Sequence, residues 1–193
     1  SLIAGRLIHK GYKSRSWMGW QVPIITDNKH KYAKINQIYK TKIIKYLKSG
    51  GIPIIAGFQG VNGEGRVTTI GRGGSDASAI MLAKFFKAER CIIYTDVEGV
   101  YTTDPKKLKK AKKIRVISYE EMLEMASLGA KVMQPVSIQD ARLSRIDVEV
   151  KSSFKNKPGT LITKRKNIIN RNIITGISST QNDAKVTLVG VKD

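Results

Sequence analysis

Cysteine and long apolar runs are both scarce in this chain of 193 residues. The one cysteine, Cys91, cannot form an internal disulfide, and its place in the apolar run 91–94 predicts a buried thiol in a reducing compartment. The longest uncharged apolar stretch, residues 52–61, falls well short of the roughly 20 residues that a membrane-spanning helix needs. We therefore expect a cytoplasmic protein that does not cross a membrane.

Acidic residues are scarce as well, because 15 Asp and Glu stand against 35 Lys and Arg and give a formal net charge of +20. Such a charge attracts polyanions without specificity, so a basic nucleic-acid-binding protein is one alternative. Lysine outnumbers arginine, however, and the cations are spread along the chain except at residues 106–113 and 164–166. No zinc-finger spacing, aromatic RNA-binding signature or heptad-flanked basic helix is present, and we expect no specific nucleic-acid partner.

Hydrophobic residues make up 41% of the chain, enough for one sizeable core. Their spacing predicts helices over residues 1–9, 31–49, 77–86 and 129–144, and another after a Ser118–Glu121 capping box. It predicts strands over residues 52–56, 91–94 and 147–150, and a hairpin turn at Asn62-Gly63. This alternation indicates an α/β fold. The Lys- and Asn-rich residues 164–172 predict a linker, with strand-like runs beyond it at 173–178 and 184–191.

The most distinctive local feature is the loop Gly71-Arg72-Gly73-Gly74-Ser75-Asp76, between the hairpin and a predicted helix. Glycines let backbone N–H groups approach an anion, and a helix N-terminus adds partial positive charge. The loop could instead only satisfy a turn, with Ser75 or Asp76 as an ordinary N-cap. Arg72 favours a ligand, because a guanidinium binds a carboxylate or phosphate through two parallel hydrogen bonds. The loop is not a P-loop, since no Gly-Lys-Ser/Thr follows it.

A second polar loop, residues 95–105, follows the predicted strand 91–94 with the sequence Thr-Asp-Val-Glu-Gly-Val-Tyr-Thr-Thr-Asp-Pro. Ligands of open α/β sheets bind beyond the carboxyl ends of strands, where the hydroxyls and carboxylates of this loop would lie. Asp76, Asp96 and Asp104 could hold Mg²⁺, or each could be a helix or turn cap. The alternative is a polar surface loop that turns at Asp104-Pro105.

Four strings, in order and spacing, closely resemble aspartate kinase (aspartokinase) of the amino-acid-kinase superfamily. They are Ala56-Gly57-Phe58-Gln59-Gly60, Thr69-Ile70 with the glycine loop 71–76, residues 95–105, and Gly129-Ala130-Lys131. The resemblance runs over nearly the whole chain, and residues 152–162 resemble the end of the kinase domain. Related kinases of glutamate, acetylglutamate or uridylate usually lack the Gly-Arg-Gly-Gly-Ser-Asp hexapeptide, so the resemblance indicates aspartate as the substrate.

The resemblance implies a three-layer αβα sandwich of the amino-acid-kinase type, partial in this chain, followed by an incomplete ACT (α+β) segment. It assigns residues 1–163 to the C-terminal part of the kinase domain, 164–172 to a linker and 173–193 to the start of an ACT regulatory domain. It also implies a homo-oligomer for the full-length form.

The activity that the resemblance implies is transfer of the γ-phosphoryl group of ATP, accompanied by Mg²⁺, to the β-carboxylate of L-aspartate. The product, 4-phospho-L-aspartate, leads to lysine, threonine, methionine and diaminopimelate. By resemblance, Arg72 and Asp76 are catalytic, and Arg72, Gly73, Gly74 and Ser75 bind the substrate. The ATP-binding residues implied in the same way are Thr95, Asp96, Tyr101, Lys106, Ala130 and Lys131.

Two departures from the family pattern affect these expectations. Lys106 stands where relatives commonly carry arginine, so the charge is kept but the bidentate geometry is lost. The family's opening Lys-Phe/Tyr-Gly-Gly strand and its later Gly-Glu, which contributes to aspartate binding, are not in this chain. We therefore expect a fragment with little or no kinase activity alone. The alternative is a catalytically inactive remnant that binds nucleotide or acts as a regulatory subunit.

Overall fold

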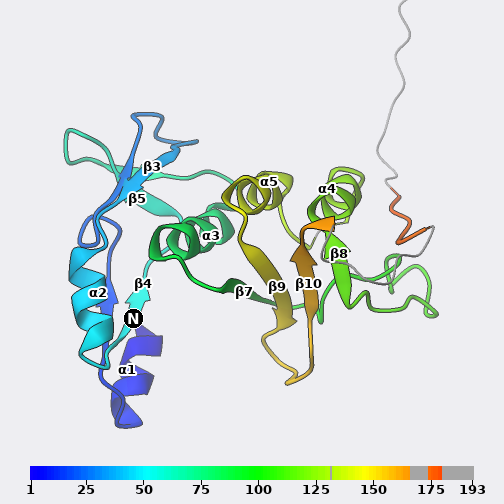
Figure 1. Cartoon of the computed structure of the whole chain (residues 1–193), viewed down its shortest axis with the longest axis horizontal. Coiled ribbons are helices and arrows are strands. Elements are labelled where there is room, and N and C mark those ends of the chain that lie inside the picture. Colours follow the sequence, from blue (N-terminus) through cyan, green and yellow to red (C-terminus); the bar gives the residue numbers. More distant parts are fainter. Residues whose placement is uncertain (131, 166–173, 180–193) are drawn as a thin grey trace, which may run out of the picture.

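The computed structural model describes residues 1–130, 132–165 and 174–179 (Figure 1). Its helices are α1 (Leu2–His9), α2 (Thr41–Lys48), α3 (Gly74–Phe86), α4 (Tyr119–Ser127) and α5 (Pro135–Ser144). Its strands are β1 (Ser14–Trp17), β2 (Ile24–Thr26), β3 (Ile35–Ile38), β4 (Ile52–Ile55), β5 (Gln59–Val61), β6 (Val67–Thr69), β7 (Arg90–Thr95), β8 (Val116–Ser118), β9 (Asp147–Ser152) and β10 (Thr160–Thr163). None of the described helices has the length and hydrophobicity that a bilayer crossing requires.

The strands form mixed sheets, which confirms the predicted α/β class. The largest core is built on the sheet with strand order β7-β9-β10-β8, in which β7 and β9 are parallel and β10 runs antiparallel to β9. A second four-stranded sheet has the order β3-β2-β5-β6, and β1 pairs in parallel with β4.

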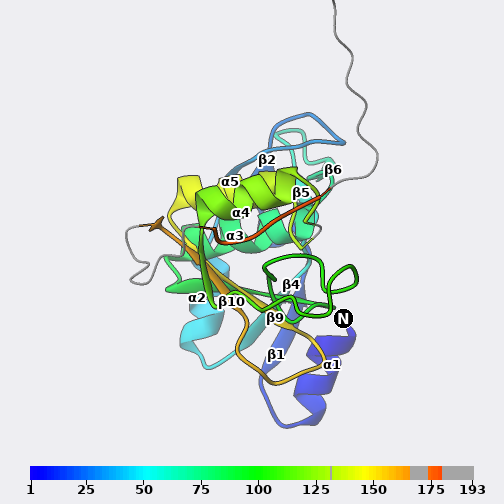
Figure 2. The ribbon, with the colours of Figure 1, turned by 90° about the vertical axis from the view of Figure 1, so that its right-hand side faces the viewer.

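Helices α3, α4 and α5 lie together on one face of the β7-β9-β10-β8 sheet (Figures 1 and 2). Cys91 and Ile93 of β7 are buried on this side, which confirms the predicted core thiol. The alternate residues Ile92 and Tyr94 point the other way and are 41% and 61% exposed. The expected sandwich has helices on both faces of the sheet. In the described residues, helices α3, α4 and α5 form a layer on one face of this sheet (Figures 1 and 2).

The predicted helix over residues 31–49 is wrong in its first half. Residues 35–38 form β3, which pairs antiparallel with β2, and helix α2 begins only at Thr41. Because the register shifts at Ile25/Thr26, Ile35 and Ile38, three residues apart, pair with Thr26 and Ile24, which are only two residues apart. A spacing of three is also the spacing of a helical face, so the strand resembled a helix in sequence.

The hairpin of β5 and β6 is confirmed, but its turn differs from the expected one. The residue with positive φ is Gly65 (φ 77°), two positions after Gly63. The buried Asn62 fixes this turn, because its Oδ1 accepts hydrogen bonds from the N–H groups of Glu64 at 3.1 Å and Arg66 at 2.9 Å.

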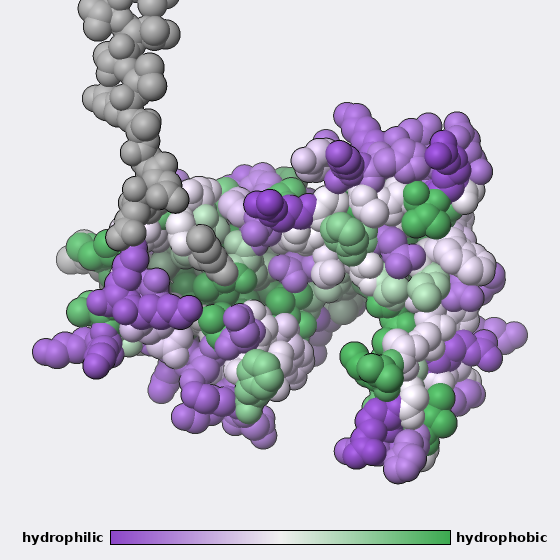
Figure 3. All heavy atoms as spheres, turned by 180° about the vertical axis from the view of Figure 1, so that it is seen from behind, coloured by the Kyte–Doolittle hydropathy of each residue, from purple (hydrophilic) through white to green (hydrophobic). Residues whose placement is uncertain are grey.

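Helix α1 is present as predicted, but its apolar side is not a core face in the described structure. Leu2 and Ile3 are 94% and 63% exposed, and Ala4 is its one buried residue. The end of the molecule that carries α1 projects as a lobe, separated from the body by a notch (Figure 3).

The C-terminal predictions have mixed outcomes. The Ser118–Glu121 capping box and the strand beginning at Asp147 are confirmed. The helix predicted over 129–144 starts only at Pro135, where proline suits the first helical position. The strand predicted over 173–178 is wrong where it is described, because residues 174–178 pair with none of the described strands and contact α4 through side chains such as Thr175. The predicted strand at 184–191 lies outside the described residues.

Candidate functional site

The glycine loop begins α3 without a side-chain cap. Helix α3 starts at Gly74, and its N-cap is Gly73 in the left-handed conformation (φ 75°), a backbone state that favours glycine. Ser75 and Asp76 are thus inside the first turn, which contradicts the alternative in which either is the N-cap. The Gly74 N–H donates to the Gly71 carbonyl at 3.0 Å, so within the described residues the N–H groups of Ser75 and Asp76 are the ones in this turn that are available to an anion.

Two other segments lie close to this loop and to the helix that it begins. An atom added as Cβ at Gly73 would lie 2.7 Å from the side chain of Gln134, which precedes α5, and Ser137 Oγ donates a hydrogen bond to the Gly73 carbonyl at 3.3 Å. After β4, the Phe58 N–H donates to Ser78 Oγ at 3.0 Å. Sequence reasoning missed Gln134 and Ser137, because no local pattern links them to a loop some sixty residues earlier.

Arg72 and Asp76 differ in their surroundings. Arg72 is exposed, and within the described residues no carboxylate forms an ion pair with its guanidinium. Asp76 is half-buried, and this burial raises the pKa of its carboxyl group. Burial and then the charge of Asp76 raise the pKa of the Cys91 thiol to about 11, which is consistent with Asp76 lying over β7.

The second polar loop leaves the end of β7 and is tied to the β9–β10 connection. Thr95 Oγ1 donates to Asp96 Oδ1 at 3.0 Å, and the Ser153 N–H donates to the Thr95 carbonyl at 2.8 Å. Further along, the Val100 N–H donates to the buried Thr160 Oγ1 at 2.9 Å, and Tyr101 forms an antiparallel bridge with Lys113.

The topology brings the two loops to one edge of the molecule. Helix α3 packs against β7 and is joined to it by residues 87–89, so the two run antiparallel, and the start of α3 lies beside the end of β7. Helix α5 leads into β9 in the same way, and β9 is parallel to β7. The Ser137–Gly73 hydrogen bond confirms that the starts of α3 and α5 meet. This edge contains the carboxyl ends of β7 and β9, where open α/β sheets bind ligands.

The other residues predicted to bind ATP are Ala130, Lys106 and Lys131. Ala130 lies between α4 and α5, close in sequence to the start of α5, and its N–H donates to the Met125 carbonyl at 2.8 Å. Lys106 is exposed, and its backbone N–H donates to Asp104 Oδ1 at 2.9 Å. Lys131 lies outside the described residues.

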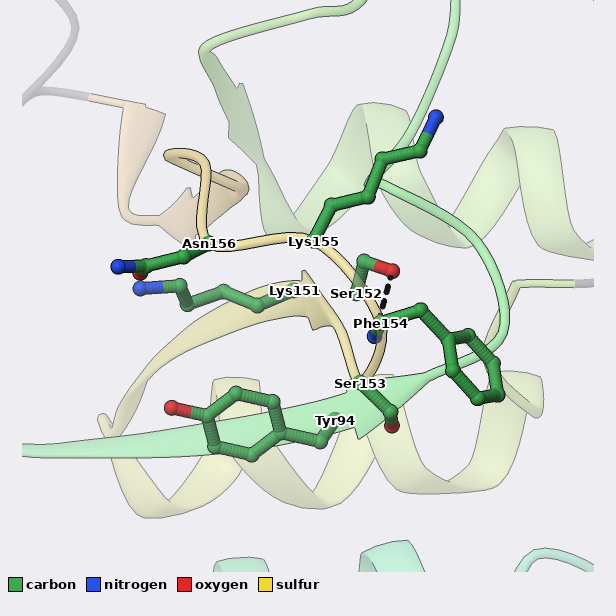
Figure 4. A pocket seen from close by; sticks show the side chains of 7 residues that line it. All are labelled: Tyr94, Lys151, Ser152, Ser153, Phe154, Lys155 and Asn156. Atoms are coloured by element: carbon green, nitrogen blue, oxygen red, sulfur yellow. Dashed lines mark hydrogen bonds between the residues drawn. The ribbon is translucent and has the colours of Figure 1, made fainter.

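A hollow of about 260 Å³ adjoins the ends of β7 and β9. It is lined by Tyr94, Lys151, Ser152, Ser153, Phe154, Lys155 and Asn156. The polar ends of Tyr94, Lys151 and Asn156 extend to one side of it, whereas the Lys155 side chain extends the other way (Figure 4). The hollow therefore lies beside the loop at Thr95 rather than between the two loops.

No group of three or more His, Cys, Asp or Glu side chains that could hold a metal ion occurs among the described residues. Mg²⁺ prefers several oxygen ligands and often takes them from phosphate groups and water. A single carboxylate such as that of Asp76 can contact a Mg²⁺ ion whose other ligands are phosphate oxygens and water.

Comparison with known proteins identifies the family of the chain. Residues 1–152 match the model of the Amino acid kinase family. The whole chain is 46% identical over 192 residues to an aspartokinase of Geobacillus stearothermophilus, and 99% of it is 45% identical to an aspartokinase of Rickettsia felis. It spans about half the length of these relatives, 47% and 48% respectively.

A solved structure is similar as well. E. coli aspartokinase III in complex with aspartate and ADP superposes with a TM-score of 0.77 and 35% identity, over 86% of this chain and 38% of that protein. The fold, the shared edge and the family match lead to one conclusion: the chain belongs to the amino acid kinase family.

Proposed function

We propose that this chain carries the phosphoryl-transfer site of an aspartate kinase. In the proposed reaction, an oxygen of the β-carboxylate of L-aspartate attacks the γ-phosphorus of ATP. The bond from that phosphorus to the β,γ-bridging oxygen breaks, which gives 4-phospho-L-aspartate and ADP. Such a transfer depends mainly on alignment and on neutralising charge on the phosphoryl oxygens, which backbone N–H groups and cations can supply.

The observation that carries the proposal is the start of α3 without a side-chain cap, at the edge where β7 ends, with Arg72 beside it and no carboxylate paired to Arg72 among the described residues. In this proposal Arg72 binds a carboxylate of aspartate, and Gly73, Gly74 and Ser75 line the substrate and phosphate region. Asp76 organises the catalytic centre. The nucleotide would bind at Thr95, Asp96, Tyr101, Lys106, Ala130 and Lys131.

The relatives support the choice of substrates. The aspartokinases at 45% to 46% identity align with the whole of this chain or nearly so, and the similar E. coli structure holds aspartate and ADP. Mg²⁺ would accompany the nucleotide and neutralise charge on the phosphates, and Asp76 or Asp96 would contact the ion or its water. The product would enter lysine, threonine, methionine and diaminopimelate synthesis.

Binding of both substrates tests the proposal. Calorimetric titration of the purified protein with Mg-ADP and with L-aspartate should show each binding, and D-aspartate and L-glutamate should bind more weakly than L-aspartate. Absence of binding by both substrates would contradict the proposed function.

Turnover distinguishes the two alternatives. Aspartate-dependent ADP release in a coupled assay would identify a working kinase site and refute the expectation of an inactive chain. Binding of both substrates without turnover is the result expected of an inactive kinase fragment, whereas binding of nucleotide without L-aspartate would favour the nucleotide-binding remnant. The domain division at residues 164–172, the ACT assignment, the homo-oligomer and the cytoplasmic location stay predictions.

A further inference from the structure

Glu98 lies in the middle of the loop formed by residues 95–101, hereafter the nucleotide loop, and contacts two lysines from distant parts of the chain. Lys155 Nζ donates to Glu98 Oε1 at 2.5 Å, and Lys113 Nζ lies 3.9 Å from Glu98 Oε2. Lys113 Nζ also donates to the Pro158 carbonyl at 2.6 Å. Glu98 therefore links the nucleotide loop to the β9–β10 connection, both directly and through Lys113.

The setting of Glu98 makes this link stronger than a fully exposed ion pair. The side chains of Glu98 and Lys113 are only 24% and 23% exposed, and that of Lys155 is 58% exposed. The hydrogen bond from Lys155 is the main cause that lowers the pKa of Glu98, with the charges of Lys157 and Lys113 adding to it. Without the carboxylate, these lysines would repel one another at close range.

The opposite side of the nucleotide loop is fixed independently. The buried Thr160 Oγ1 accepts from the Val100 N–H at 2.9 Å and donates to the Ile114 carbonyl at 2.6 Å. Gly99 packs against the same hydroxyl so closely that an added Cβ would lie 2.6 Å from Thr160 Oγ1. The half of the loop before Gly99 is held at its start by the Ser153 N–H, which donates to the Thr95 carbonyl at 2.8 Å. Beyond Thr95, Glu98 is the described side chain that ties this half to the β9–β10 connection.

We infer that Glu98 is a positioning residue, which holds the nucleotide loop against the β9–β10 connection through Lys155 and Lys113 and thereby sets the affinity for nucleotide. The inference rests on the proposed function, because it assigns Thr95, Asp96 and Tyr101 to nucleotide binding. Glu98 does not itself touch the nucleotide in this account. Its effect reaches the ligand through the backbone of the loop.

The test compares Glu98→Gln with the parent protein in two measurements. Amide hydrogen exchange of residues 96–99, without nucleotide, should become about twofold to fivefold faster, the range expected for loss of a partly exposed ion pair. The dissociation constant for Mg-ADP should rise by a similar factor, while that for L-aspartate stays unchanged.

A charge exchange and a matched control separate positioning from general stability. The double variant Glu98→Lys with Lys155→Glu restores the pair and should recover part of both effects. Glu120, on the first turn of α4 and away from the nucleotide loop, has its carboxylate 4.0 Å from Arg142. Glu120→Gln should change neither the exchange rate of residues 96–99 nor the dissociation constant for Mg-ADP.

The outcomes are distinct from those that test the proposed function. Unchanged exchange in Glu98→Gln, or faster exchange with an unchanged dissociation constant for Mg-ADP, would overturn the positioning role. If the parent protein binds no nucleotide, the proposed function fails and the link to affinity fails with it. The exchange measurement would in that case still decide whether Glu98 holds the loop.

Discussion

The surroundings of Arg72 bear directly on the kind of ligand that this residue can bind. A guanidinium that served only the fold would be expected to pair with a carboxylate or a carbonyl, yet Arg72 is exposed and unpaired within the described residues. It stands beside uncapped N–H groups at the start of α3, which attract the same kind of anion. Both features favour a carboxylate or phosphate ligand.

Replacement of Arg72 by lysine tests this use. Arg72→Lys keeps the charge but loses the two parallel hydrogen bonds, so the dissociation constant for L-aspartate should rise about tenfold. Binding of Mg-ADP should hardly change, which serves as the internal control. Equal affinity of both proteins for aspartate in a calorimetric titration would show that Arg72 does not bind the substrate.

The ionised carboxylate of Asp76 should lower the stability of the folded protein at neutral pH. Because burial raises its pKa, the protonated form is favoured in the folded state, and the resulting stability is present below the ordinary aspartate pKa and lost as the pH rises through the raised value. Asp76→Asn should therefore raise the melting temperature at pH 7, with a smaller gain near pH 4. Thermal unfolding across this range measures the gain, and a lower melting temperature at pH 7 would mean that the helix dipole outweighs burial at this position.

At the scale of single residues, the sequence predicted what lies within one motif and missed what forms between motifs. Arg72 and Asp76 share a short glycine-rich string, so their proximity follows from the chain itself. The contact of Glu98 with Lys155 joins residues 57 positions apart and depends on the pairing of β7 with β9. No spacing in the sequence encodes that contact.

Among the elements, α4 offers the clearest local signal. Ser118 Oγ accepts from the Glu121 N–H at 3.2 Å, and Glu121 Oε2 accepts from the Ser118 N–H at 3.0 Å, so the capping box is complete. Burial acts to raise the pKa of Glu121, but hydrogen bonds from Ser118 and Thr175 outweigh it and lower the pKa.

Removing the cap should destabilise the protein measurably. Ser118→Ala should lower the free energy of unfolding by about 1 kcal/mol, the usual cost of losing an N-cap. Ser127→Ala, at the exposed C-terminal end of the same helix, is the control and should change it by less than about 0.5 kcal/mol. Urea unfolding of the three proteins measures both values, and equal loss in the two variants would contradict a specific role for the cap.

Elements with a local signal were predicted, whereas those fixed by distant partners were not. The capping box specified the start of α4, and glycines marked the hairpin of β5 and β6. Strand β3 was missed because pairing with β2 overrides an isoleucine spacing that also suits a helix. The start of α5 was placed too early because apolar residues after Gly129 continue the pattern without being helical.

For the whole molecule, the net charge of +20 should set the response to salt. Few acidic residues are available to pair with the cations, so self-repulsion opposes the compact state. Raising the ionic strength from about 0.01 M to about 0.15 M shortens the screening length from about 30 Å to about 8 Å and should raise the melting temperature. A melting temperature that falls over this range would show that attractive ion pairs dominate the electrostatics.

The proposed function requires one edge of the molecule to receive two ligands, an amino acid at the start of α3 and a nucleotide at the end of β7. The most direct measurement is a crystal structure of the protein with L-aspartate and a non-hydrolysable ATP analogue. We predict a substrate carboxylate on Arg72, and the terminal phosphate of the analogue pointing toward the first N–H groups of α3 from the side of Thr95. Aspartate and nucleotide bound on separate faces, or away from both loops, would contradict the account.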